Sequence, residues 1–136
     1  MKLKYALLIL FFLPLGLLAQ DDVIFPVYPG CEGSANMQDC FTYNVAEQMV
    51  KNTGYRVQRD DEEDYTVIET FRVKCRFTIN KKGVAKKISI SGDMDEDLRK
   101  KFLKNLKRLP KMKPGSRDGF VEDLYFLLPL KIVITE

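Results

Sequence analysis

The chain has 136 residues, with 22 lysines and arginines against 19 aspartates and glutamates, and it contains no histidine. This length suits a single domain, and the near balance of charge does not favour a nucleic-acid-binding protein. Because the sequence offers no histidine, no recognisable metal set and no serine paired with a base, it assembles no acid–base or nucleophilic site. We therefore predict a protein that is not an enzyme and needs no cofactor or metal.

The first nineteen residues have the three-part pattern of a secretory signal peptide. Lys2 and Lys4 precede an apolar run from Tyr5 to Ala19, and Ala19 is the expected residue before the cut. An uncleaved membrane anchor is the alternative, but the run is short for a span of about 20 residues and contains Pro14. Removing residues 1–19 leaves 136 − 19 = 117 residues. We predict an exported protein.

Residues 20–40 are predicted to form an extended arm and a disulfide loop. The arm contains Pro26 and Pro29, which disfavour regular structure. Cys31 and Cys40 bracket a turn-rich loop, and in an exported chain they could close a small disulfide ring. Cys75 would then remain a free thiol that fills space in the core.

The main domain is predicted to span residues 41–136 and to begin with a helix. Apolar side chains recur at helical spacing from Phe41 to Lys51, with Asp39 or Thr42 as the candidate N-cap. Asn52 and Gly54 supply the stop signal. A first helix over Phe41–Lys51 is therefore expected.

An acidic run follows from Asp60 to Asp64. Carboxylate oxygens suit Ca²⁺, so this run could form a cation site, but it lacks the glycine turn and the alternating spacing of a calcium loop. We interpret it as a solvated connector rather than as a metal site.

The segment from Phe71 to Ile90 predicts a β-hairpin. Apolar and polar residues alternate from Phe71 to Asn80, which is the period of a strand with one buried face. Gly83 marks the reversal, after which Lys86, Ile88 and Ile90 share one parity. A hairpin is barely stable alone, so other elements must cover its apolar face.

A second helix is predicted from Asp95 to Leu109, lying across the hairpin. Acids at its start and bases after them complement the helix dipole. The basic residues between Arg99 and Lys113 could bind nucleic acid or lipid head groups. Because no aromatics are interleaved to stack bases, we interpret them as a solvated face.

The chain ends in a mostly apolar strand between Phe120 and Ile134. Pro129 cannot donate a ladder hydrogen bond, which confines this strand to a sheet edge or a bulge. We predict that it is the sheet edge and that it binds a partner. The predicted partner-binding residues are Leu124, Tyr125, Phe126, Leu127, Leu128, Leu130, Lys131, Ile132, Val133 and Ile134.

Several of these segments, in this order, resemble the C-terminal domain of TonB, and most closely the versions encoded widely in Bacteroidetes. They are VYPGC at 27–31, the hairpin FTINKKGVAKKISI at 77–90, LPKMKPG at 109–115 and LPLKIVI at 128–134. The resemblance covers nearly the whole mature chain, from Val27 to Ile134. It implies an α+β fold with a three-stranded antiparallel sheet packed against two helices. It also implies a periplasmic protein that pairs an exposed sheet edge with a short segment of an outer-membrane receptor.

The same edge has an alternative use. An unpaired row of N–H and C=O groups is a template for any extended segment, so two copies could pair with each other. The alternative function is thus an exported structural or self-associating protein that forms a homodimer without transducing energy. Membrane contact is expected only if the N-terminal segment is not cleaved.

Overall fold

The computed structural model describes residues 22–59 and 67–135. The predicted signal peptide and the acidic run lie outside the described residues. The elements are β1 (Val23–Ile24), α1 (Met37–Val50), β2 (Arg56–Gln58), β3 (Val67–Ile79), β4 (Ala85–Gly92), α2 (Glu96–Leu106), β5 (Ser116–Arg117), β6 (Phe120–Val121) and β7 (Leu124–Thr135).

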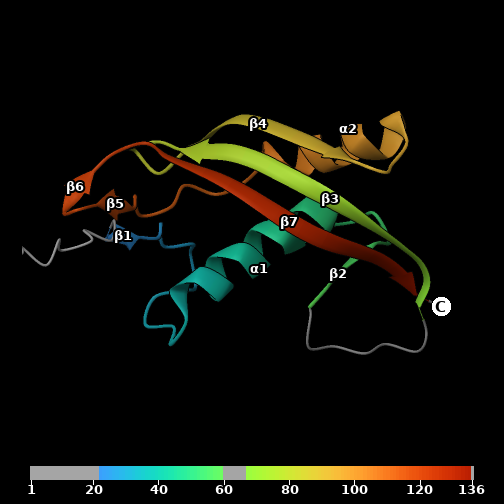
Figure 1. Ribbon diagram of the computed structural model, residues 1–136, viewed down its shortest axis with the longest axis horizontal. Helices are drawn as coiled ribbons and strands as arrows, with labels where there is room; N and C mark the ends of the chain where they lie inside the picture. The colour runs from blue at the N-terminus through green and yellow to red at the C-terminus, as the bar shows by residue number, and fades with distance from the viewer. Residues whose placement is uncertain (1–21, 60–66, 136) are drawn as a thin grey trace, which may run out of the picture.

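The fold is α+β, with the main sheet in one layer and two helices in the other (Figure 1). The four strands of the main sheet have the order β2-β7-β3-β4, and all neighbouring pairs are antiparallel. A separate small sheet has the order β1-β5-β6 and lies at the far end from the C-terminus (Figure 1). The predicted class and the two helices are confirmed. The main sheet has one strand more than the three predicted, because β2 joins it.

The alternating pattern of β3 places one side of the strand in the core, as the sequence predicts. Val73, Cys75 and Phe77 are at most 1% exposed, whereas Arg72 and Lys74 are exposed. Phe77 stacks on Phe126 of β7 with 5.6 Å between ring centroids. Aromatic contacts of this kind add to the hydrophobic energy of burial.

Helix α1 begins four residues earlier than the predicted start. Asn36 is the N-cap, and its side-chain oxygen accepts a hydrogen bond from the Asp39 N–H at 3.1 Å. This cap satisfies one of the otherwise unpaired amides of the first turn. Residues that the sequence analysis placed in the disulfide loop are therefore helical, and Cys40 lies inside α1.

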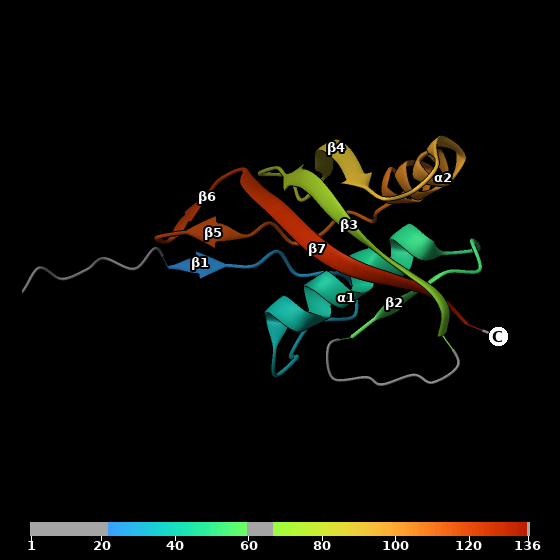
Figure 2. The same ribbon diagram turned by 45° about the vertical axis from the view of Figure 1, so that its right-hand side comes forward.

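The two helices are joined through amide side chains. The Asn105 side chain of α2 donates to the carbonyls of Met49 and Lys51 at 2.9 and 2.8 Å, and Gln48 of α1 donates back to the Asn105 carbonyl at 3.1 Å. The last carbonyls of a helix have no partner within the helix, so Asn105 supplies one from outside. This contact joins α2 to the C-terminal end of α1 (Figure 2).

Strand β4 contains a bulge that the sequence pattern did not reveal. The register with β3 shifts between Arg76 and Thr78, and Lys87 has φ 54°. The extra residue changes the parity, so Lys86 faces solvent beside Thr78, whereas Ile88 and Ile90 face the core. The predicted shared parity of Lys86 with the two isoleucines is wrong for this reason.

The hairpin turn is held against the segment that follows α2. The Met112 N–H donates to the Gly83 carbonyl at 2.9 Å. Gly83 has φ +81°, and a Cβ atom at this position would lie 1.7 Å from the Met112 carbonyl oxygen. Gly83 is therefore required both for its backbone conformation and for the close approach of Met112.

A pair of glycine substitutions tests this contact. Gly83→Ala and Gly54→Ala place Ala at nearly the same φ, +81° and +80°, but nothing lies within 4 Å of the added Cβ at Gly54. Backbone strain should lower the free energy of unfolding of both variants by about 1–2 kcal/mol. Gly83→Ala should lose a further 1–3 kcal/mol, roughly, to the clash. Equal free energies of unfolding in denaturant melts would contradict the close approach.

The phase of β3 is tested by truncating side chains on its two faces. Phe77 is 0% exposed, so Phe77→Ala should cost about 3–5 kcal/mol through the cavity that it leaves. Lys74 is exposed, and Lys74→Ala should change stability by about 0.5 kcal/mol or less. Chemical denaturation of both variants measures the difference, and similar losses would show that the strand faces are misassigned.

Candidate functional site

The candidate site is the half of β7 that has a strand on one side only. Along Leu124–Thr135, β7 pairs with β3. On its other side it pairs with β2, at Lys131, Ile132 and Val133 alone. The prediction that the last strand is a sheet edge is therefore wrong for these three residues. Residues 124–130, which we call the open stretch, have no second strand among the described residues.

The sequence analysis did not predict strand β2, and the reason is local. Strand β2 has only three residues, Arg-Val-Gln, and neither its length nor its polarity marks it as a strand. Its Val57 is packed against the core, and its pairing with β7 supplies the backbone hydrogen bonds. Tertiary context thus makes a strand from a segment whose own pattern indicates a connector.

The predicted partner-binding residues divide between two faces of β7. Leu124, Phe126, Leu128, Leu130 and Ile132 belong to the core cluster and are at most 8% exposed. They are buried against the helices and offer a partner no side-chain surface.

The remaining predicted residues differ in exposure. Tyr125 and Leu127 are 61% and 43% exposed, and Lys131 is half-buried. Val133 is fully buried and Ile134 half-buried, so these two are not available surface. The accessible side chains of the open stretch are therefore those of Tyr125, Leu127 and Pro129, which is exposed as well.

Pro129 indicates where the backbone groups of the open stretch point. A proline is tolerated in a sheet where its nitrogen faces away from the ladder, and Pro129 lies opposite Lys74 of β3. Backbone directions alternate along a strand, so the N–H groups of Tyr125 and Leu127 also point away from β3. Lys131 has the same parity and lies opposite Gln58 of β2. The open stretch thus presents unpaired donors on the side of β2.

The opposite edge of the sheet is protected against strand addition. Strand β4 carries Lys86 and Lys87, both exposed, at its bulge. Lysines and bulges are two devices that proteins use to keep an edge from pairing with other chains. The open stretch of β7 has neither device, and only Pro129 interrupts its donors. It is therefore the edge better suited to an added strand.

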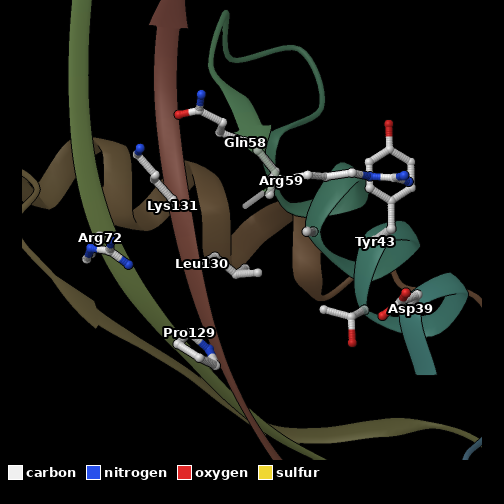
Figure 3. Close-up of a pocket in the computed structure, with 11 residues that line it drawn as sticks. Asp39, Tyr43, Gln58, Arg59, Arg72, Pro129, Leu130 and Lys131 are labelled. Atoms are coloured by element: carbon white, nitrogen blue, oxygen red, sulfur yellow. The ribbon is translucent and has the colours of Figure 1, made fainter. Parts of the chain in front are cut away.

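A pocket of about 470 Å³ lies where the open stretch meets β2 and α1 (Figure 3). Arg59 reaches over the Tyr43 ring on one wall, with its guanidinium carbon 4.0 Å from the ring centroid. Arg72 and Lys131 lie on the other side, along β3 and β7. The lining residues are Asp39, Thr42, Tyr43, Ala46, Val57, Gln58, Arg59, Arg72, Pro129, Leu130 and Lys131.

The pocket carries more positive than negative charge. Among the described lining residues, three side chains are cationic, against the single carboxylate of Asp39. That carboxylate already accepts a hydrogen bond from the Asn36 amide at 2.9 Å. An anionic group in the pocket would therefore meet attraction from Arg72 and Lys131 with little competition from within the pocket.

The disulfide lies beside this pocket and confirms the predicted pairing. Cys31 and Cys40 are bonded, with 5.9 Å between their Cα atoms. Cys40 is in the first turn of α1, next to Asp39, and the Asn44 side chain donates to its carbonyl at 2.7 Å. The bond therefore ties the arm to the part of α1 that forms a wall of the pocket. Cys75 is free and buried, and burial raises the pKa of its thiol to about 12.

Other kinds of site find little support in the described residues. Within 22–59 and 67–135, no group of three or more His, Cys, Asp or Glu side chains could hold a metal ion. In the same ranges no helix is both long and apolar enough to cross a membrane.

Comparison with protein-family models, with curated proteins and with solved structures finds no match.

The disulfide generates a prediction for the pocket wall. Replacing both bonded cysteines by serine should lower the free energy of unfolding by about 3 kcal/mol or somewhat less, because the closed loop is short. Amide exchange should also rise in the first turns of α1. Peptide mass mapping of the unreduced parent protein, with a thiol reagent added, should find the Cys31–Cys40 bond and leave Cys75 unmodified until denaturant is added. Modification of native Cys75 would contradict its burial.

Proposed function

We propose that this chain is a periplasmic protein-binding module of the TonB C-terminal type, which pairs its open stretch with a short segment of an outer-membrane transport receptor. The observation that carries the proposal is that β7 has a second partner strand at residues 131–133 and none at 124–130 among the described residues. The signal-like N-terminus supports the location, and the resemblance to TonB supports the class of partner.

Strand addition would extend an arrangement that the fold already contains. Strand β2 occupies the side of β7 at Lys131–Val133, so an added strand would continue along the same side of β7. Its backbone carbonyl groups would accept hydrogen bonds from the N–H groups of Tyr125 and Leu127. Each net hydrogen bond is worth about 0.5–1.5 kcal/mol, so a short segment would bind reversibly.

Self-association by the same stretch is the second candidate function. Tyr125 and Leu127 are large, exposed apolar side chains on this strand. Two open stretches related by a two-fold axis could pair with each other and cover these side chains. Such a dimer would compete with the binding of a receptor segment. A higher protein concentration would therefore favour the dimer and weaken the binding of the segment.

Replacing one donor tests both functions. Leu127→Pro removes an N–H group that points away from β3, and the matched control Leu127→Ala removes the same side chain but keeps the N–H. Leu127→Pro should abolish the binding of blocked peptides from periplasm-facing receptor segments, whereas Leu127→Ala should weaken it by less than about tenfold, as expected for one partly exposed side chain. Peptide titration followed by NMR measures both variants, and thermal melts check that both are folded.

Sedimentation of the same proteins separates the two functions. Receptor binding predicts a monomer whose Tyr125 and Leu127 amides shift when peptide is added. A dimer of the parent protein that dissociates in Leu127→Pro, without peptide binding, would instead favour self-association. If a folded Leu127→Pro variant changes neither peptide binding nor association, then the open stretch is not the working surface.

A further inference from the structure

Among the described residues, one face of the main sheet carries cations and no carboxylates. Strand register fixes which side chains share this face, because directly opposed residues point to the same side. Arg72, Lys74 and Arg76 of β3 lie opposite Lys131, Pro129 and Leu127 of β7. The residues of this outward face are Thr70, Arg72, Lys74, Arg76 and Thr78 of β3, Lys86, Ser89 and Ser91 of β4, Tyr125, Leu127, Pro129, Lys131 and Val133 of β7, and Arg56 and Gln58 of β2.

The described residues leave the outward face open at its cationic positions, although Val133 at the β2 end of this face is fully buried. Both helices pack on the other face of the sheet (Figure 1, Figure 2). Arg72, Lys74 and Lys86 are exposed, and Arg76 is half-buried and donates to the Ser91 hydroxyl at 3.1 Å. None of these cations forms an ion pair with a described carboxylate. Because the whole chain is close to charge balance, the positive face results from how the fold distributes charge.

The outward face adjoins the open stretch of β7. Tyr125, Leu127 and Pro129 form a column between the open side of β7 and the cationic column of β3. Arg72 and Lys131 also line the pocket at the end of the open stretch (Figure 3). A strand added there would lie about 4.8 Å from β7, which leaves its outward side chains within reach of these long cationic side chains.

Alternation then sets the chemistry of the added strand. Successive side chains of a strand point to opposite faces. The inward ones would meet Thr42 and Tyr43 of α1, which line the pocket, and these positions suit small apolar groups. The outward ones would lie beside Tyr125, Leu127 and Pro129, with Arg72, Lys74 and Arg76 one strand further away on β3.

We propose that the segment captured by the open stretch alternates apolar residues, which face α1, with acidic residues, which face the cationic side of the sheet. This inference rests on the proposed function and specifies the partner of the same site. Charge complementarity at such a surface mainly speeds association and excludes wrong partners.

Other anionic partners fit the observations less well. A bilayer surface could meet the cations but would leave the N–H groups of Tyr125 and Leu127 unpaired. Single-stranded nucleic acid is bound by aromatic stacking platforms, and among the described residues Tyr125 is the one aromatic residue of the outward face. A second copy of the chain would bring its own cations to the same surface.

Two blocked peptides of about six residues, the usual length of a strand, test the inference. One alternates valine with glutamate, and the other alternates valine with glutamine. At low salt the glutamate peptide should bind the full mature protein roughly tenfold more tightly. The advantage should shrink at roughly 0.15 M salt, where charges are screened over about 8 Å.

Charge reversal supplies the matched control. Arg72→Glu should remove the preference for the glutamate peptide, whereas Lys101→Glu, an equal change at an exposed position of α2, should leave it. Equal binding of both peptides to all three proteins would overturn the acidic specificity and leave the proposed function standing. If neither peptide bound or shifted the Tyr125 and Leu127 amides, the proposed function would fail as well. Another outcome would be that the protein binds phosphatidylglycerol vesicles and neither peptide. If Arg72→Glu abolished that vesicle binding, the face would be assigned to a membrane.

Discussion

The long antiparallel pairing of β3 with β7 is the constraint on which the rest of the structure depends. It runs from Val67 opposite Thr135 to Ile79 opposite Leu124. Because these strands are neighbours, the phenylalanines at 77 and 126 meet over α1, and Phe41 of α1 lies 4.8 Å from the Phe126 ring. The same register decides which residues face the solvent. Core and outward face are thus two consequences of one pairing.

The sequence was sufficient to predict the elements whose pattern is set by burial. Strand β3 alternates from Phe71 to Ile79, and its buried side contains Cys75 as expected. The local cap of α1 was missed, and so were the features set by a partner elsewhere in the chain. Asn36 caps α1 through a local hydrogen bond that apolar spacing does not encode, and β2 exists because β7 is beside it. A bulge at Lys87 likewise requires the register with β3, which one strand alone cannot supply.

The same division applies to the candidate site. Pro129 correctly marks a strand with an unpaired side, because a proline nitrogen cannot join a ladder. It does not say how far that side extends, which depends on where β2 stops at Gln58. The pocket was not predictable either, because Tyr43 of α1, Arg59 after β2 and Arg72 of β3 are far apart in the sequence. Only the fold brings these residues together around the end of the open stretch.

An unpaired strand exposes a protein to unwanted pairing, so its persistence needs a physical reason. Strand β4 has lysines and a bulge at its edge, which shows that this fold can protect an edge where pairing is not used. On β7 the cations lie one strand away from the open side rather than on it, on the outward face of β3. In that position they repel a second cationic copy and do not block the backbone of an acidic segment. On the proposed function, these charges would therefore select acidic segments without blocking the open stretch.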